Sequence, residues 1–312
     1  MSRIDQLGGS VSPVLTKFVT GFRNPQFIAD KVCPVVPTLT ETGSIMGMGK
    51  DGFKLYETRR EIGNPIPEAI PPDFSADTYQ VAEEAILRKY DQRELEAAQN
   101  YGTAEVLKLK QRYLRICQNN VLMTREKAVA DIVFGTSYYA SGNKVTLSGS
   151  DQITDPSSDP LGVVDTGMAA ARADMFIEPN IGVIGYTAWQ KLKRHAQLVE
   201  IFKHVQKGLL TPALVAEAFE LEELIVGKNG YATDTGVHTD LWGDYFALLY
   251  RPPVAEMVEG TTPHTVIIQQ KGYPKAYQFP IERILHPVAS QDMFTVKNVS
   301  TSYGYLISDL VA

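Results

Sequence analysis

Several short strings in the sequence have residue types that could do chemistry, and the first is a run of glycines. Gly47-Met48-Gly49-Lys50-Asp51-Gly52 fits the GxGxxG spacing with which dinucleotide-binding proteins bring their backbone close to a pyrophosphate. Such a site needs a helix directly after the glycines, because the N-terminus of that helix holds the phosphates. Here Phe53–Tyr56 alternates like a strand, and Pro65 and Pro67 exclude a following helix of normal length. The string therefore indicates the tip of a hairpin and not a nucleotide site.

Residue types used in nucleophilic catalysis and metal binding are present but not clustered. Ser141-Gly142-Asn143-Lys144 fits the SxxK spacing without the partner motifs that such enzymes need. Cys33 and Cys117 stand far apart and form no CxxC pair, so neither a zinc site nor a disulfide framework is expected. Three aspartates could hold a weakly bound cation, although in a turn-rich stretch they more often cap turns: Asp151, Asp155 and Asp159. The histidines are scattered and form no HExxH motif, so we expect no cofactor, no metal and no catalytic residue: His195, His204, His238, His264 and His286.

A long amphipathic helix is predicted between Thr103 and Phe134, and one of its faces is basic. Apolar residues recur every three to four positions and define the expected buried stripe: Val106, Leu109, Tyr113, Ile116, Cys117, Met123, Val129 and Ile132. The other face carries mostly cations, with three acidic residues among them: Lys108, Lys110, Arg112, Arg115, Arg125 and Lys127, beside Glu105, Glu126 and Asp131. Lys108, Arg112 and Arg115 are therefore candidates for contacts with phosphates. A solvated helix face without a ligand is the alternative.

Composition limits the class of protein further. The chain has 312 residues, of which 44% are hydrophobic and 21% charged, and these fractions are typical of a folded globular protein. Thirty Lys and Arg against 36 Asp and Glu give a net charge of −6, which argues against a dedicated nucleic-acid-binding protein. Neither a signal peptide nor a run of about 18 apolar residues is visible. We therefore expect a soluble intracellular protein with no membrane partner.

The elements that must position these groups fall into three stretches. Residues 1–40 are expected to form an arm with a short helix near Asn24–Lys31. Residues 41–76 are rich in glycine and proline and too polar for a core, so we expect a long hairpin, with a strand at 53–58, that a partner orders. Beyond them the patterns of helices and strands indicate an α+β fold. The expected helices are 91–99, 103–134, 161–173, 186–206 and 212–220, and the expected strands are 77–90, 144–147, 181–185, 224–226, 245–250, 265–269, 276–279, 295–299 and 303–307.

Several strings occur in a particular order along the chain: Asn24–Asp30 with Pro34–Pro37, Ser148–Gln152 with Ser158–Pro160, Ile181–Gly185 with Ala188–Lys193, Thr211–Ala216, and Leu241–Asp244. With the layout of arm, polar hairpin, long helix, α+β unit and returning strands, they resemble the major capsid proteins of tailed bacteriophages, which have the Hong Kong 97-like fold. The resemblance covers nearly the whole chain. Each string alone is common, and their order gives the resemblance its specificity.

The resemblance implies a division of the chain into four parts. Residues 1–42 would be the N-terminal arm and 43–76 the extended loop. Residues 77–157 and 262–312 would form the peripheral domain, which contains the long spine helix, and 158–261 would form the axial domain. No long charged helical segment precedes the arm, so a fused scaffolding domain is not expected.

The resemblance also implies a structural protein and not an enzyme. Such a chain would self-assemble into homo-pentamers and homo-hexamers and then into an icosahedral head around double-stranded DNA, bound non-specifically. It would be assembled in the bacterial host cytoplasm and remain in the virion, with a scaffolding protein, a portal and a decoration or cement protein as further partners. Two alternatives stay open: an encapsulin-type nanocompartment shell that encloses protein cargo, and a soluble α+β enzyme with an unrecognised site.

Candidate contact residues follow from the same resemblance. The extended loop would lie on a neighbouring subunit through six residues: Lys50, Phe53, Lys54, Tyr56, Arg59 and Arg60. The two arginines would pair with carboxylates of that neighbour, for instance Glu217, Glu220, Glu222 and Glu223. The basic face of the spine helix, with Lys108, Arg112 and Arg115, would face the lumen. Some relatives join subunits through a Lys–Asn isopeptide bond, for which Lys50 or Lys54 and Asn298 are the candidates here.

Overall fold

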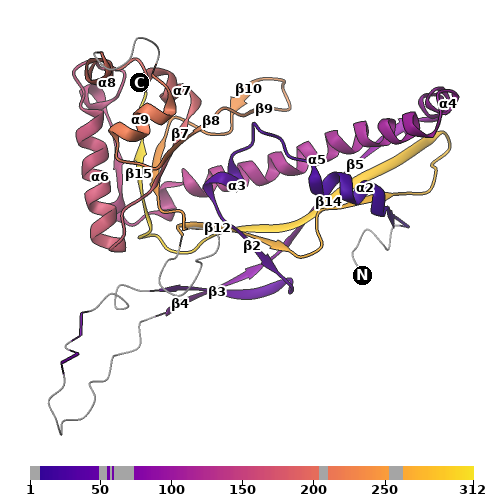
Figure 1. Cartoon of the computed structure of the whole chain (residues 1–312), viewed down its shortest axis with the longest axis horizontal. Coiled ribbons are helices and arrows are strands. Elements are labelled where there is room, and N and C mark those ends of the chain that lie inside the picture. The colour runs from indigo at the N-terminus through magenta and orange to yellow at the C-terminus, as the bar shows by residue number, and fades with distance from the viewer. Residues whose placement is uncertain (1–7, 49–54, 57, 60–73, 204–209, 253–262) are drawn as a thin grey trace, which may run out of the picture.

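The structure is a computed structural model that describes residues 8–48, 55–56, 58–59, 74–203, 210–252 and 263–312 (Figure 1). One helix, α5, runs along the molecule. A long sheet lies against it, and a five-stranded sheet with its own helices lies at one end. The hairpin β3–β4 projects to one side. Helices and strands are thus combined as the predicted α+β fold requires. None of the helices within the described residues is long and apolar enough to cross a lipid bilayer.

The helix α5 (Thr103–Val133) begins and ends as predicted, and its 31 residues span about 46 Å. It follows the short helix α4 (Gln92–Asn100), where the Asp91 side chain accepts a hydrogen bond from the Arg93 backbone N–H at 2.8 Å. The first half of α5 packs through Leu114 on the long sheet. Its last turns pack through Val129 and Val133 on the five-stranded sheet. The helix therefore connects the two cores of the molecule.

The long sheet has the strand order β1 (Ser10–Val11), β13 (Lys275–Gln278), β14 (Leu285–Asn298), β12 (Thr265–Gln270) and β2 (Val35–Thr38). A further strand, β5 (Ala82–Asp91), pairs antiparallel with β14 from Phe294 to Leu285. Only the end of β14 was predicted, because Pro287 and the charged Asp292 interrupt the apolar pattern of its first ten residues. The helix α2 (Pro13–Gly21), which packs on β13, was not predicted either. The short helix α3 (Ala29–Val32) follows in the predicted arm.

The five-stranded sheet has the order β6 (Lys144–Thr146), β15 (Gly304–Ser308), β11 (Phe246–Leu249), β7 (Ile181–Gly185) and β8 (Glu223–Gly227). Its helices are α6 (Pro160–Met175), α7 (Tyr186–Leu192), α8 (Ala196–Phe202) and α9 (Pro212–Ala218). Three short 3₁₀ helices precede α6: Thr136–Tyr138, Ser141–Asn143 and Gly149–Asp151. A separate hairpin is made by β9 (Gly230–Ala232) and β10 (His238–Asp240). Gly185 at the end of β7 must be glycine, because a Cβ there would lie 1.7 Å from the Gly243 carbonyl oxygen.

The predicted helix 186–206 is wrong, since α7 and α8 are separate helices. His195 has an extended backbone between them, and its ring Nδ1 accepts a hydrogen bond from the Gln197 N–H. The side chain of His195 is thereby the N-cap of α8, so α8 begins as a separate helix after α7 has ended at Leu192. Residues 204–206 of the predicted helix lie outside the described residues.

The predicted hairpin is present at its base. The strands β3 (Thr42–Met48) and β4 (Phe74–Gln80) pair antiparallel, with Thr42 opposite Gln80 and Met48 opposite Phe74. The strand predicted at 53–58 is not formed at its described residues, since the backbone of Leu55, Tyr56 and Thr58 is not that of a strand. The other residues of that segment, Phe53, Lys54 and Glu57, lie outside the described residues.

Candidate functional site

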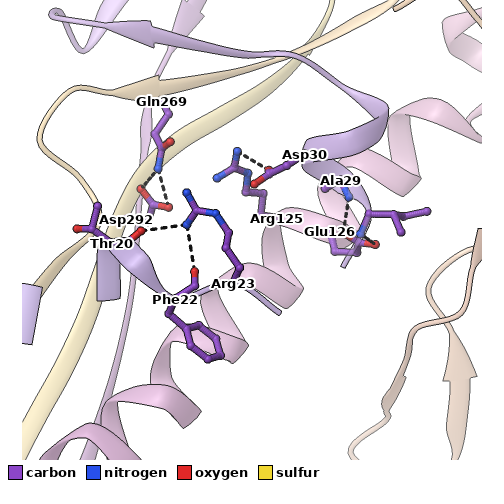
Figure 2. Close-up of polar contacts among 10 residues, drawn as sticks. Thr20, Phe22, Arg23, Ala29, Asp30, Arg125, Glu126, Gln269 and Asp292 are labelled. Carbon is purple, nitrogen blue, oxygen red and sulfur yellow. Dashed lines mark hydrogen bonds and ion pairs between the residues drawn. The ribbon is translucent and has the colours of Figure 1, made fainter. Parts of the chain in front are cut away.

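A buried polar junction joins the N-terminal arm, the helix α5 and the five-stranded sheet (Figure 2). Its centre is Glu126, whose side chain is fully buried. Its carboxylate accepts hydrogen bonds from the backbone N–H of Ile28 at 2.9 Å and of Ala29 at 2.8 Å. It also accepts one from the indole Nε1 of Trp242 at 2.8 Å. One side chain thus holds three segments that are far apart in the sequence.

The electrostatics of Glu126 reflect two opposing causes. Burial raises the pKa of its carboxyl group, and the three N–H donors act in the opposite direction. The nearby carboxylate of Asp30 raises that pKa further. Burying the charged carboxylate of Glu126 therefore costs free energy, and the hydrogen bonds from the three N–H groups offset only part of that cost.

Arg125, the neighbour of Glu126 on α5, is 4% exposed and reaches the same arm. Its Nη2 lies 2.7 Å from Asp30 Oδ1, and its guanidinium stands 5.7 Å from the centre of the Phe294 ring. Among the described residues, the buried Nε of Arg125 has no hydrogen-bond partner. Arg125 therefore ties the arm to α5 beside the sheet strand β14.

A second buried carboxylate, Asp292, lies on β14 near Arg125 (Figure 2). The amide Nε2 of Gln269 donates to both of its oxygens, at 2.8 and 3.0 Å. Burial raises the pKa of Asp292, while the Gln269 bond and the charge of Arg125 lower it. On the arm, Arg23 donates to the carbonyls of Thr20 and Phe22 and so satisfies the C-terminal end of α2.

The sequence analysis placed Arg125 and Glu126 on the solvent face of α5, and that prediction is wrong. Buried positions on this helix include Leu114, Gln118, Val121, Arg125 and Val129. Their spacing of three and four residues is the helical period, so a signal existed. The predicted stripe was drawn from apolar residues alone, whereas an ion pair and backbone donors let charged residues lie within it.

The contact that most resembles a catalytic pair is Ser158 with His195, whose Oγ and Nε2 lie 3.1 Å apart. The Gln197 N–H donates to His195 Nδ1, so Nδ1 is the unprotonated nitrogen and Nε2 carries the hydrogen. Nε2 then donates to the Asp155 carbonyl at 3.1 Å. A nitrogen that already holds a hydrogen cannot accept the serine proton, so this pair is structural.

Two of the three aspartates of this region cap local structure, as their sequence predicted: Asp155 caps a turn and Asp159 caps a helix. Asp155 accepts from the Ser157 hydroxyl and backbone N–H, and these bonds lower the pKa of Asp155. Asp159 accepts from the Gly162 N–H at the start of α6. Within the described part of the chain, His, Cys, Asp and Glu form no group of three or more that could hold a metal ion.

The residues predicted to contact a neighbouring subunit are placed only in part. Lys50, Phe53, Lys54 and Arg60 lie outside the described residues. Tyr56 is half-buried and Arg59 is exposed. Among their predicted partners, Glu217, Glu220 and Glu222 are exposed, and Glu223 pairs with Arg251 at 3.0 Å.

The other predicted site residues lie on α5 and at the end of β14. Lys108, Arg112 and Arg115 are exposed on α5, and Lys108 pairs with Glu105 at 2.6 Å. Asn298 is half-buried at the end of β14, where its Nδ2 donates to the His264 carbonyl at 3.0 Å. The structure does not bring Asn298 and the three cations into one site.

Comparison of the sequence with known proteins shows to which family the chain belongs. No protein-family model matches the chain. Over 314 residues, 99% of both chains, it is 33% identical to the major capsid protein of Burkholderia phage BcepMu. It is 29% identical to the major capsid protein of Pseudomonas phage JBD67 over 269 residues, 81% of each chain.

Solved structures agree on the fold. A phage-related protein from Bordetella bronchiseptica RB50 is 25% identical and superposes with a TM-score of 0.81, covering 97% of this chain and 98% of that one. The capsid of cyanophage P-SCSP1u (TM-score 0.56, 10% identity, 92% and 89% covered) shares the fold alone. So does the SrpI encapsulin of Synechococcus elongatus PCC 7942 (TM-score 0.54, 12% identity, 100% and 97% covered).

The fold is thus common to phage capsids and encapsulins, and it does not separate the two. Sequence identity along the full length does separate them, because it links the chain to a phage protein at 33%. A capsid protein of this kind assembles with copies of itself into the shell of the virion head. The chain belongs to the major capsid proteins of bacteriophages and has their Hong Kong 97-like fold.

Proposed function

We propose that this chain forms pentamers and hexamers that close into an icosahedral head around double-stranded DNA. The observation that carries the proposal is the 33% identity over 99% of both chains with a phage major capsid protein. Assembly would take place in the cytoplasm of the bacterial host. The chain would act there as a structural protein without enzymatic activity.

The four-part division of the chain is part of this proposal. Residues 1–42 serve as the N-terminal arm, 43–76 as the extended loop, 77–157 with 262–312 as the peripheral domain, and 158–261 as the axial domain. The buried junction at Glu126 supports a firm attachment of the arm to the spine helix, because three N–H groups from two distant segments converge on it. The strand β4 (Phe74–Gln80) crosses the boundary between the loop and the peripheral domain.

The extended loop is proposed to lie on a neighbouring subunit through Lys50, Phe53, Lys54, Tyr56, Arg59 and Arg60. Leu55, between these residues, is 100% exposed, and a leucine in that state gains stability when a partner covers it. Many modest contacts of this kind add up in a closed shell, so no single one needs high affinity.

The exposed cations Lys108, Arg112 and Arg115 are proposed to face the lumen and to contact DNA phosphates without sequence preference. Arg112 and Arg115 make no ion pair with the described residues, which leaves them available to phosphates. The negative net charge of the chain is consistent with a container that holds DNA loosely. A scaffolding protein, a portal and a decoration protein would complete the set of partners.

A covalent link between subunits is a further part of the proposal. The amine of Lys50 or Lys54 would attack the side-chain carbonyl carbon of Asn298, form an amide bond and release ammonia. The Nδ2 of Asn298 already donates to the carbonyls of His264 and Ser300. These contacts fix the orientation of the amide that the amine would approach.

The test is assembly of the purified chain, alone and with its scaffolding protein, followed by sedimentation and electron microscopy. We expect ring-like capsomers or megadalton shells. A chain that stays a monomer under all these conditions contradicts the proposal. Shells purified from infected cells should contain DNA and a portal; a shell that encloses a co-purifying enzyme would instead indicate a nanocompartment.

A further inference from the structure

The strand β8 forms one edge of the five-stranded sheet, and a groove runs along it. Among the described strands only β7 pairs with β8. A cavity of about 530 Å³ lies between β8 and the arm and is lined by Pro25, Ile28 and Glu223–Val226. An edge strand beside an open groove can accept an additional strand, because its outer N–H and C=O groups remain available.

The groove continues past Lys31 into a second cavity of about 960 Å³. Arg251 stands where the two meet. It donates through Nη1 to the Lys31 carbonyl and through Nη2 to Glu223 at 3.0 Å. The backbone N–H of Arg251 is held in turn by the Asn180 side chain at 2.7 Å. These bonds connect the arm to the sheet at the point where the two cavities meet.

The second cavity combines apolar walls with a net negative charge. Pro34, Val35 and Pro179 line its walls. Its lining has four carboxylates, Asp30, Glu178, Glu220 and Glu222, against two cations, Lys31 and Arg251, so its net charge is negative. Glu222 accepts a hydrogen bond from Asn180, and Glu178 pairs with Arg172. An occupant that fits would be extended and apolar at one end and cationic at the other.

We propose that this groove binds residues 55–59 of a second copy of the chain as an added strand beside β8. In the described structure Leu55 is fully exposed and Arg59 has no ion pair, although a leucine and an arginine four residues apart match an apolar groove with carboxylates in its lining. Arg59 would pair with Glu220 or Glu222 of the second copy. The proposal names the docking site of the extended loop, so it rests on the proposed shell function.

The direct test is hydrogen exchange on the unassembled full-length chain with an excess of a synthetic peptide of residues 50–62. We expect exchange in residues 223–227 to slow about tenfold, since their outer amides become paired. A peptide with Arg59→Glu should protect them much less. This measurement does not need shells, so it decides the groove even if the chain never assembles.

A charge swap tests the same contact in shells. Arg59→Glu, or Glu220→Arg with Glu222→Arg, should each lower the yield of shells about tenfold, because like charges then meet across the contact. The combination of all three should restore the yield. Glu217→Arg is the matched control, since Glu217 is exposed on the neighbouring helix α9 but does not line the groove. Unchanged exchange of β8 with the peptide, or swaps that behave like the control, would overturn the proposal.

Discussion

At the residue scale, Glu126 is the group on which most of the arm's attachment depends. Its two oxygens accept from the N–H groups of Ile28, Ala29 and Trp242, and an amide cannot do the same, because its NH₂ group would face a donor. We expect Glu126→Gln to lower the free energy of unfolding by about 1–3 kcal/mol. Chemical denaturation of the unassembled subunit measures this, with the exposed Glu217→Gln as control. Equal stability of the two variants would show that the carboxylate is not needed.

Gln291 offers the opposite case, since it is 0% exposed and neither its Oε1 nor its Nε2 has a hydrogen-bond partner within the described part of the chain. A buried amide without hydrogen bonds loses its hydration and gains nothing in return. Gln291→Met, of similar volume, should therefore raise the free energy of unfolding by about 1 kcal/mol. Gln269→Met is the matched control: the Gln269 amide binds Asp292, so its loss should destabilise the protein. A destabilised Gln291→Met variant would mean that this amide has a partner in solution.

His264 predicts a dependence on pH. Burial lowers its pKa to about 4, from 6.5 in an unfolded chain, so the unfolded state binds more protons between these values. Stability should therefore fall as the pH drops from about 6.5 towards 4, by about 2 kcal/mol between pH 7 and pH 5 for this group.

Glu126 and Asp292 act in the opposite sense, because burial raises their pKa values and their protonation stabilises the folded state as the pH falls. A His264→Gln variant isolates the histidine, since it keeps the carboxylates and an amide donor. Thermal unfolding at pH 7 and pH 5 should show a smaller loss in the variant than in the parent. Equal losses would exclude His264 as the cause.

At the scale of elements, the sequence predicted what depends on local pattern. The bounds of α5 follow from a regular apolar period ended by Gly135, and β7 follows from five consecutive small or apolar residues. The first ten residues of β14 could not be predicted in the same way. Pro287 and Asp292 are tolerated there only because other chain segments cover them, for example Gln269 of β12. The break at His195 likewise depends on a turn 40 positions earlier, at Asp155.

The residues of the candidate site also fall into those that the sequence predicted and those that it did not. The exposure of Lys108, Arg112 and Arg115 was predicted from the helix period and is correct. The helical period places Arg125 on the buried side of α5, but the partners of the junction could not be predicted, because they come from the arm and from Trp242 and a single sequence does not say which distant segments meet. Periodicity identifies a face of a helix but not what covers it.

The packing of α5 on the long sheet gives a prediction at this scale. Leu114 is fully buried against Val288 and Ala276, so Leu114→Ala should cost about 2–5 kcal/mol through lost contacts and a cavity. Leu107, on the same helix, is 36% exposed, and Leu107→Ala should cost less than about 1 kcal/mol. Urea denaturation compares the two. Similar costs would mean that the helix is not anchored through Leu114.

At the scale of the whole molecule, charge is distributed unevenly. The cavity that continues the groove past Lys31 has Glu178, Glu220 and Glu222 in its lining, whereas the exposed face of α5 carries Lys108, Arg112 and Arg115. In the function proposed above, contacts between subunits and contacts with DNA use these two different surfaces. Substitutions on one surface should leave the function of the other intact, which makes the two experimentally separable.

The basic face gives the last prediction. Changing Lys108, Arg112 and Arg115 together to glutamine removes three exposed cations that are remote from the groove, so folding and shell formation should be unchanged. Binding of capsomers to double-stranded DNA should weaken and depend less on salt. Each lost phosphate contact lowers the slope of log K against log salt by about 0.9, so three contacts should lower it by about 2.7. Lys127→Gln is the control, because Lys127 is an exposed cation of the same helix that is not among the three proposed phosphate contacts. A slope equal to that of the parent would show that this face of α5 does not meet DNA.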